Sequence, residues 1–261
     1  MAGKRGLIMG VANDHSIAWG IARQLYNQGA ELAFTYQGGA LEKRVRPLAQ
    51  QAGSSLVVPC DVEQDGDIER AFHVLGETWD SLDFVVHAIA YSDKDELKGA
   101  YLDTTRGNFR RTLDISCYSF TAVARAAAAT MSDGGSLLTL TYLGAERVTP
   151  NYNVMGVAKA ALEASVRYLA VDLGDRGIRV NAISAGPMRT LAGSAIADAR
   201  FVFNWSREHA PLRRNVLLEE VGKAGLYLIS PLSAGVTGEV HHVDGGYNLI
   251  GIPLPRNLNG D

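Results

Sequence analysis

Residues 6–20 read GLIMGVANDHSIAWG, and this stretch decides the predicted fold. A short apolar run typical of a strand ends at Gly10, which allows a tight turn, and a helical segment begins at Ser16 and Ile17. The free N–H groups at the start of such a helix can hold a pyrophosphate. After the strand, Gly10 and Gly20 are the only glycines, so the common G-x-G-x-x-G pattern is absent and a purely structural turn is the alternative.

The same alternation continues along the chain. Short β-branched or apolar runs are followed by longer segments of helical periodicity, which is the pattern of a parallel sheet covered by helices on both faces. We therefore predict an α/β fold, a Rossmann-like doubly wound seven-stranded parallel sheet. The strands are expected at residues 6–11, 31–36, 55–62, 84–89, 136–142, 179–184 and 239–244.

No repeat or linker divides the chain, so residues 1–261 are predicted to form a single domain. Ser16, Asp65 and Asn151 are candidate caps of three helices. The polar and aromatic stretch at about 190–214 is too long for a simple connection and is expected to be an inserted lid over the substrate. The helices are expected near residues 17–28, 40–52, 65–79, 107–130, 152–175 and 219–229.

The composition is that of an ordinary globular chain, with 261 residues, 47% of them hydrophobic and 20% charged. A formal net charge of −3 gives no overall attraction for nucleic acid or an anionic membrane. Cys60 and Cys117 lack the close spacing of a redox or zinc motif and are expected to be free thiols. The first residues show no cleavable leader and no apolar span of about 20 residues, which favours a cytoplasmic protein.

Ligands of doubly wound sheets bind beyond the carboxyl ends of the strands. The second strand is followed by Gln37, with no acidic residue for an adenosine ribose and no basic residue before Lys43 for a 2′-phosphate. Because Gln37 can hydrogen-bond the ribose, NADH is favoured over NADPH. After the third strand, Asp61 can accept a hydrogen bond from an adenine amino group while Val62 covers the ring, although Asp61 could instead cap the next helix.

The fourth and sixth strands also end in candidate cofactor contacts. Ala88 and Ala90 would bring a small-residue backbone past the cofactor, whereas His87 is expected to be a buried structural histidine. After the sixth strand, the backbone could embrace a nicotinamide carboxamide and the pyrophosphate. The residues of this segment are Met188, Arg189, Thr190, Leu191 and Ala192, and Thr190 adds a hydroxyl.

Tyr152 and Lys159 lie seven residues apart in TYLGAERVTPNYNVMGVAKAALEA, residues 141–164. Seven residues make nearly two helical turns, so both side chains are expected on one helix face. A tyrosine hydroxyl can donate a hydrogen bond to an oxygen that becomes anionic, and a lysine ammonium favours negative charge nearby. The pair therefore suits reduction at a carbonyl or conjugated carbonyl. Taken alone, it is also compatible with a packed tyrosine beside a solvated lysine.

The spacing of this pair is Tyr-x6-Lys, and a second tyrosine, Tyr142, stands ten residues before Tyr152. Together with GVANDHSIAWGIA, CDV, RVNAISAGPMRTLA, PLRRNV and TGEVHHVDGGY, this motif resembles the enoyl-acyl-carrier-protein reductases of bacterial type II fatty-acid synthesis. These are divergent members of the short-chain dehydrogenase/reductase superfamily, whose ordinary members have Tyr-x3-Lys. Met155 occupies that tyrosine's position here, and the resemblance runs from about residue 6 to 248.

The resemblance implies that hydride from NADH goes to the β-carbon of a trans-2-enoyl thioester, with the Tyr152 hydroxyl stabilising charge on the thioester oxygen. It implies that Lys159 holds the nicotinamide ribose and that Tyr142 is a second active-site residue. The substrate would be carried by acyl carrier protein and lie near Ser92, and the protein would be a homotetramer. Cofactor contacts are implied at Gly10, Ser16, Ile17, Gln37, Asp61, Val62, Ile89, Lys159 and residues 188–192.

Two departures from the family pattern change expectations. Family members commonly read Ser-Ile-Gly-Phe-Ala-Pro after the fourth strand, whereas residues 88–93 here are Ala-Ile-Ala-Tyr-Ser-Asp. The methyl group of Ala90 narrows the space beside the nicotinamide, so we expect altered sensitivity to flat aromatic inhibitors. Two lid positions that often carry basic residues are apolar, which leaves Arg200 and Arg207 as candidate contacts for the carrier protein.

Other functions fit the sequence less well. A short-chain reductase of a ketoacyl substrate would need the Tyr-x3-Lys spacing, and a non-catalytic nucleotide-binding regulator would not need the tyrosines and lysine together. Residues 182–186 lack the first glycine of a serine hydrolase elbow. His241 and His242 are neighbours on a strand and point to opposite faces, so no metal site is expected.

Overall fold

The structure is a computed structural model, and it describes residues 1–191, 193 and 198–252. At its centre is a seven-stranded sheet of parallel pairs in the order β3-β2-β1-β4-β5-β6-β7. This order confirms the predicted doubly wound α/β fold. The strands are β1 (Arg5–Met9), β2 (Glu31–Tyr36), β3 (Val57–Pro59), β4 (Phe84–His87), β5 (Gly135–Thr141), β6 (Ile178–Ala185) and β7 (Val240–Val243).

The third strand is shorter than the sequence predicts, because residues 60–62 turn away from the sheet. Cys60 still donates its N–H to the Tyr36 carbonyl at 2.9 Å. Asp61 then donates its N–H to the Asp67 carboxylate at 3.0 Å, which directs the chain into the next helix. With only three residues, β3 gives this turn little support from the sheet.

The predicted helix at 107–130 is interrupted by a π-helical turn over Asp114–Tyr118, and a further helix lies within the predicted lid. Short 3₁₀ turns cover Tyr101–Asp103, Leu143–Ala145, Pro231–Ser233 and Tyr247–Leu249. The α-helices are α1 (Ile17–Asn27), α2 (Gly38–Gln51), α3 (Asp65–Gly76), α4 (Arg106–Leu113), α5 (Ser119–Thr130), α6 (Asn153–Gly174), α7 (Ala199–His209) and α8 (Leu218–Ile229).

Of the three predicted helix caps, only one is correct. Ser16 is the N-cap of α1. Asp65 is the first residue of α3 and Gln64 precedes it as the cap, so the carboxylate lies in the first turn, where the helix dipole favours it. Asn151 has a φ of 57°, in the left-handed region, and the cap of α6 is Tyr152 instead.

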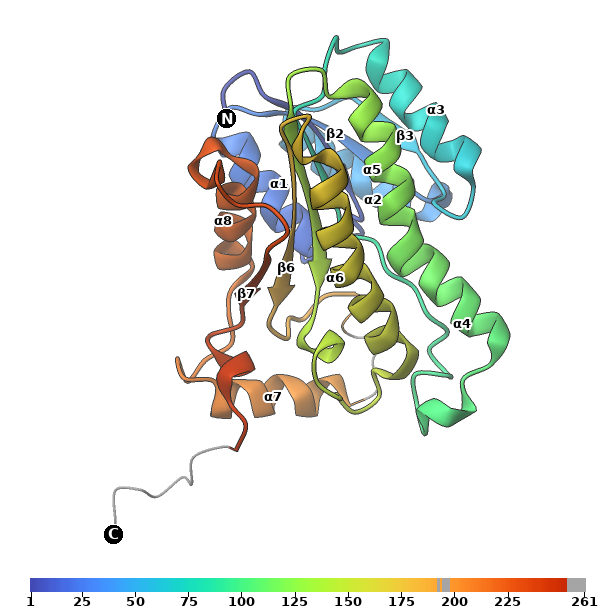
Figure 1. The fold of residues 1–261 in the computed structure, drawn as a ribbon, viewed down its shortest axis with the longest axis vertical. Coiled ribbons are helices and arrows are strands. Elements are labelled where there is room, and N and C mark those ends of the chain that lie inside the picture. Colours follow the sequence, from blue (N-terminus) through green and yellow to red (C-terminus); the bar gives the residue numbers. More distant parts are fainter. Residues whose placement is uncertain (192, 194–197, 253–261) are drawn as a thin grey trace.

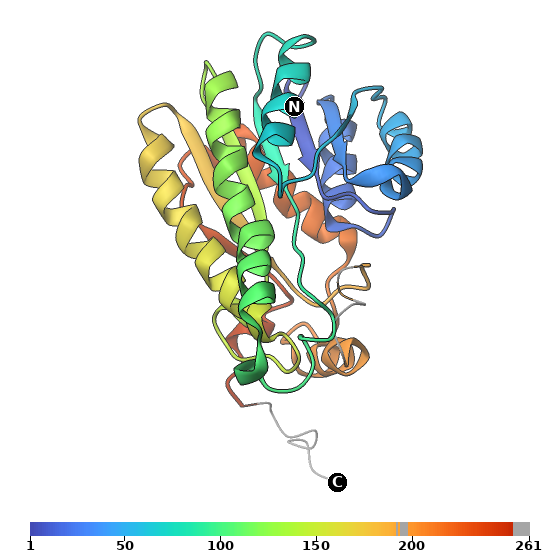
Figure 2. The same cartoon turned by 90° about the vertical axis from the view of Figure 1, so that its right-hand side faces the viewer.

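Both faces of the sheet are covered by helices, as Figures 1 and 2 show. Along β1, Leu7 and Met9 pack with α3, α5 and α6, whereas Ile8 packs with α1, α2 and α8. All three side chains are fully buried, as expected for a parallel sheet between two helical layers. Because the strands are parallel, their carboxyl ends share one edge, and α7 lies across that edge (Figure 1).

Arg179, near the start of β6, donates hydrogen bonds to carbonyls at the carboxyl end of α8. Its Nη1 donates to the Leu228 carbonyl at 2.7 Å and to the Ser233 hydroxyl at 2.8 Å. Its Nη2 donates to the carbonyls of Ile229 and Ser230 at 3.0 and 3.2 Å. A helix end leaves such carbonyls without partners inside the helix, and here the guanidinium shares them with the Ser136 and Ser233 hydroxyls.

Replacing Arg179 with methionine is expected to lower the free energy of unfolding by about 2 kcal/mol, because partly buried carbonyls lose a charged donor. Urea unfolding followed by circular dichroism measures the loss. Arg179→Lys keeps the positive charge but not the several N–H donors of the guanidinium, so its free energy of unfolding should fall by about half as much. A methionine variant as stable as the parent protein would show that water satisfies this helix end equally well.

Candidate active site

Tyr142, Tyr152 and Lys159 lie together at the carboxyl end of β5. The rings of Tyr142 and Tyr152 meet edge to face, with centroids 5.1 Å apart and planes at 71°. Lys159 extends from α6 and donates from Nζ to the Leu140 carbonyl at 2.8 Å. Tyr152 and Lys159 are each only 6% exposed. The two residues predicted to share a helix face are therefore both buried near the carboxyl end of β5.

Burial sets the protonation states of this cluster. Burial raises the pKa of Tyr152 well above its usual value. It also raises the pKa of Tyr142 to about 12, although a hydrogen bond to Thr149 acts in the opposite direction. Burial also lowers the pKa of Lys159 to about 8. At neutral pH both phenols keep their protons and the lysine is mostly charged. Within the described part of the chain, the Tyr152 hydroxyl has no hydrogen-bond partner and remains available to a ligand.

The position of Tyr152 depends on its two neighbours; the sequence suggested Asn151 only as a helix cap and did not single out Asn153. Asn151 and Asn153 both have positive φ, 57° and 40°. Asn151 donates from Nδ2 to the Asp198 carboxylate at 2.9 Å, next to the start of α7. Asn153 donates to the Leu97 carbonyl at 3.3 Å. Asparagine tolerates the left-handed region better than most residues, and this preference was the available signal in the sequence.

A buried carboxylate was also missed. Glu163 stands four residues after Lys159 on α6 and accepts a hydrogen bond from the Thr141 hydroxyl at 2.6 Å. Burial raises the pKa of Glu163, opposed by this hydrogen bond. The contact fixes the end of β5 to α6, immediately before Tyr142. An acidic residue on the buried face of a predicted helix was the signal that could have found it.

The turn between β1 and α1 lies against the chain that follows β4. Gly10 has a φ of 94°, and a Cβ at this position would lie 2.1 Å from the Ala88 carbonyl oxygen, so only glycine fits. The Ser16 hydroxyl accepts from the N–H groups of Ala12 and Asn13 at 3.0 and 3.1 Å. Helix α1 then begins at Ile17, and its first N–H groups have no partner within the helix.

Two further predicted contacts follow β2 and β3. Gln37 is the N-cap of α2 and has extended backbone. Asp61 accepts from the Glu63 N–H at 3.1 Å and does not cap α3, so the alternative role considered for it is wrong. Val62 is partly buried beside it. Asp61 thus stands at the end of β3 with a partly exposed carboxylate.

The segment after β6 reaches the helix of the predicted lid. Arg189 lies over the ring of Phe203 in α7, with 4.8 Å from the guanidinium carbon to the centroid. The Thr190 hydroxyl accepts from the Gly193 N–H at 2.9 Å. Met188 packs against the core beside α1, Leu191 is half exposed, and Ala192 lies outside the described residues.

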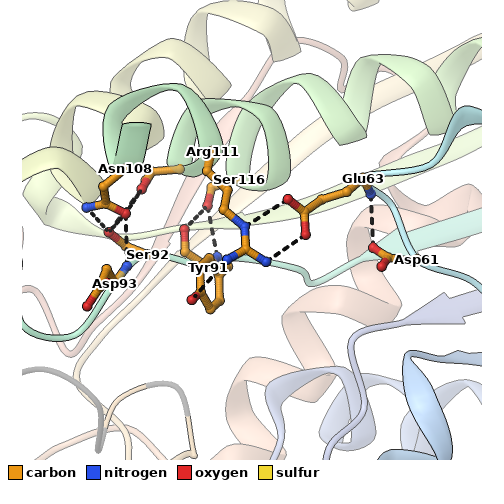
Figure 3. A network of polar contacts seen from close by, with 9 residues as sticks. Asp61, Glu63, Tyr91, Ser92, Asp93, Asn108, Arg111 and Ser116 are labelled. Atoms are coloured by element: carbon orange, nitrogen blue, oxygen red, sulfur yellow. Dashed lines mark hydrogen bonds and ion pairs between the residues drawn. The ribbon is translucent and has the colours of Figure 1, made fainter. Parts of the chain in front are cut away.

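The side chains of the loop after β4 differ in burial, and Ala90 is exposed. Ile89 is partly buried against the core. The Ser92 hydroxyl accepts from Thr112 at 2.9 Å and from the Asn108 amide at 3.2 Å, so it points toward α4 (Figure 3). A contact between Ser92 and substrate would therefore use its main chain.

His87 is the buried structural histidine that the sequence predicts. Its Nε2 lies 2.8 Å from the Ser119 hydroxyl, and burial lowers its pKa to about 3, so it is neutral. Of the adjacent His241 and His242, His242 lies with its Nε2 2.8 Å from the Glu146 carboxylate. Among the described residues, no group of three or more His, Cys, Asp or Glu is placed to hold a metal ion. No helix in the described ranges is long and apolar enough to cross a membrane.

Residues 10–248 match a family model described as enoyl-(acyl carrier protein) reductase. The chain belongs to this family. A relative named enoyl-[acyl-carrier-protein] reductase [NADH] 2, from Rhizobium meliloti strain 1021, is 65% identical over 99% of this chain and 96% of its own length. A Rickettsia typhi enoyl-[acyl-carrier-protein] reductase [NADH] FabI is 55% identical over 96% of each chain.

Solved structures of enoyl reductases have the same fold. FabI from Candidatus Liberibacter asiaticus superposes with a TM-score of 0.95 at 55% identity, covering 97% of this chain and 98% of the other. An enoyl-(acyl-carrier-protein) reductase from Anaplasma phagocytophilum, solved in complex with NAD, gives a TM-score of 0.94 at 56% identity, covering 98% and 96%. The resemblance read from Tyr142, Tyr152 and Lys159 is confirmed at the level of the family.

Proposed function

We propose that this protein is an NADH-dependent enoyl-acyl-carrier-protein reductase, which reduces the trans-2 double bond of enoyl thioesters in the last step of each type II fatty-acid elongation cycle. The observation that carries the proposal is the cluster of Tyr142, Tyr152 and Lys159 at the carboxyl edge of the sheet. The family of the chain and the names of its relatives support it.

The catalytic roles follow from the protonation states. NADH bound at this edge supplies the hydride for the β-carbon of the double bond. Tyr152, protonated and without a protein partner in the described ranges, donates a hydrogen bond to the thioester oxygen as negative charge develops there. Lys159 would hold the hydroxyls of the nicotinamide ribose, and its positive charge would favour the anion. The Tyr142 ring holds Tyr152 in place by edge-to-face contact.

The chain's residues fit a dinucleotide. The glycine turn at Gly10 brings the main chain of two loops together, and the start of α1 offers N–H groups to a pyrophosphate. Asp61 and Val62 would contact the adenine, and Gln37 would contact its ribose. The nicotinamide half would lie against Ile89 and residues 188–192. We propose the same role for the other cofactor contacts that the sequence predicts, including Ser16 and Ile17 at the start of α1.

The surroundings of Gln37 support NADH over NADPH. Arg46 lies beside Tyr36, with its guanidinium carbon 5.8 Å from the ring centroid. It donates to the Glu42 carboxylate at 2.7 Å. A cation already paired with a carboxylate has less to offer a 2′-phosphate, so the phosphate of NADPH would gain little here.

We also propose that acyl carrier protein docks beside α7. Arg200 and Arg207 are on this helix, which lies across the edge where substrate would enter (Figure 1). Asn215 donates to the Phe203 carbonyl at 2.9 Å and ties the helix to the chain after it. The lid role of residues 190–214 belongs to this proposal.

We further propose that the protein is a homotetramer and that it is located in the cytoplasm. Tyr168 and Val171 on α6 are 76% and 81% exposed, and Tyr118, just before α5, is 44% exposed; exposed apolar side chains of this kind are candidates for a subunit interface. Light scattering should give four times the chain mass of 28.0 kDa. A monomer mass would contradict the assembly but leave the reaction untouched.

The reaction is tested by oxidation of NADH with crotonyl or longer enoyl thioesters, run beside NADPH and beside a 3-ketoacyl thioester. Turnover that depends on the enoyl substrate and prefers NADH is expected. Turnover only with the ketoacyl thioester would favour the other short-chain reductase. Binding of NADH without turnover on either substrate would favour a nucleotide-binding regulator.

A further inference from the structure

Arg111, on α4, joins two loops that are far apart in the sequence (Figure 3). Its Nε and Nη2 donate to the two carboxylate oxygens of Glu63, both at 2.8 Å, which is the bidentate geometry of a strong arginine–carboxylate pair. Its guanidinium carbon also lies 4.5 Å from the centroid of the Tyr91 ring, in cation–π geometry. One side chain therefore holds the turn after β3 and the loop after β4.

The turn after β3 is the part that carries the proposed adenine contacts. Glu63 donates its backbone N–H to one carboxylate oxygen of Asp61 at 3.1 Å. The other Asp61 oxygen has no partner among the described residues and is free to accept from an adenine amino group. Fixing Glu63 thus fixes the direction of the Asp61 carboxylate and the backbone of Val62 between them.

The turn needs this support because the sheet provides little. Strand β3 has only three residues and lies at the edge of the sheet. The turn is also held by the hydrogen bond from the Asp61 N–H to Asp67 and by that from the Cys60 N–H to the Tyr36 carbonyl. Arg111 adds a charged side-chain contact from a helix 48 residues away in the chain.

The loop after β4 is held to the same helical segment. The Tyr91 N–H donates to the Ser116 hydroxyl at 3.0 Å, and that hydroxyl lies 3.1 Å from the Tyr91 carbonyl. Asp93 donates its N–H to the Asn108 side chain at 3.0 Å. This loop is where the cofactor and substrate are expected to meet. The helical segment from α4 through the π-helical turn therefore acts as a rigid support for both loops, and Arg111 reaches from it to the adenine side.

We propose that Arg111 is a positioning residue for the cofactor, acting through Glu63 and Asp61 on the adenine end. The proposal rests on the proposed NADH-dependent function. Arg111 and Glu63 are 50% and 23% exposed at their side chains, so their pair adds little to global stability. Its effect is local: it keeps the turn in the conformation that binds adenine. When fewer molecules hold the binding conformation, the apparent affinity falls by the same fraction.

The chain offers a matched control for this arginine. Arg214 forms a bidentate pair with Glu220 at 2.7 and 2.6 Å, and the two side chains are 48% and 34% exposed. This pair has the same chemistry and similar exposure, but it joins the segment before α8 to the first turn of that helix. Loss of a surface ion pair as such would affect both arginines equally.

The test is the dissociation constant of NADH, measured without substrate by nicotinamide fluorescence, for the parent protein, Arg111→Met and Arg214→Met. Arg111→Met should bind NADH about tenfold more weakly, corresponding to a turn that is correctly placed about a tenth of the time. ADP-ribose, which has the adenine end without nicotinamide, should lose the same factor. At saturating NADH, kcat should stay within about twofold, because the reacting groups are untouched.

Arg111→Lys should bind NADH more tightly than Arg111→Met but more weakly than the parent protein, since lysine keeps the positive charge but cannot form the bidentate pair with Glu63. Arg214→Met should bind as the parent does. Unchanged NADH affinity in a folded Arg111→Met, or a fall in kcat with unchanged affinity, would overturn the inference. If that variant does not fold, Glu63→Gln replaces it and should weaken NADH binding at least about threefold; unchanged binding overturns the inference equally. A parent protein that does not bind NADH would instead overturn the proposed function.

Discussion

Replacing Tyr152 with phenylalanine is expected to lower kcat for an enoyl thioester by about two orders of magnitude, a barrier increase of about 3 kcal/mol. The substitution keeps the ring and its contact with Tyr142 but removes the hydroxyl proposed to bind the substrate oxygen. Affinity for NADH should not change, since Lys159 and the cofactor loops remain. Steady-state kinetics with saturating NADH measure the effect.

Tyr142→Phe is the matched control. The Tyr142 hydroxyl is engaged with Thr149, so its loss should cost less than about tenfold in kcat. The two substitutions remove the same atom from rings that touch each other. Equal losses would mean that the two tyrosines share the chemistry, and unchanged turnover in the Tyr152 variant would refute its catalytic assignment.

Replacing Lys159 with methionine is expected to lower kcat/KM by at least about two orders of magnitude, mostly through weaker binding of NADH. Methionine fills similar space on α6 but cannot donate to ribose hydroxyls or carry charge. Direct NADH titration and steady-state kinetics separate the two contributions. An affinity for NADH equal to that of the parent protein would contradict the role of Lys159 as a ribose contact.

The same substitution tests the charge state of Lys159 through stability. Burial lowers its pKa from 10.5 to about 8, so between these values the unfolded chain binds more protons than the folded one. The free energy of unfolding therefore rises with pH in this window, by up to about 1.4 kcal/mol per pH unit, whereas below about pH 8 the cost of burying the charge is fully present.

Urea unfolding of the cofactor-free protein at about pH 7.5 and about pH 9.5 measures this slope. The parent protein should gain about 2 kcal/mol more than Lys159→Met over this interval. NADH affinity of the parent should fall over the same range, because the lysine loses its charge. Parallel pH profiles of the two proteins would show that Lys159 titrates near its ordinary pKa.

The sequence by itself determined the approximate positions of the seven strands, the layered fold and the proximity of Tyr152 and Lys159 to the same strand end, although Tyr152 is the N-cap of α6 rather than part of it. These features are local. The spacing of apolar residues reveals a strand or a helix within a window of about 10–20 residues, and a spacing of seven residues on a helix places two side chains on the same face. Even the family could be recognised from short segments around Tyr142. The turn at Gly10 was equally readable, because its positive φ admits few other residues.

Only the tertiary structure decided the contacts between segments. The π-helical turn at residues 114–118 has no periodic signature, and the positive φ of Asn151 moved the start of α6 to the residue after Tyr152. Ser92 faces α4 because Asn108 and Thr112 meet it there. The pairing of Arg111 with Glu63 spans 48 residues, and no local pattern selects one carboxylate among many as the partner of an arginine. Such contacts depend on how the chain packs, since charge and shape are matched only after distant loops reach the same edge of the sheet.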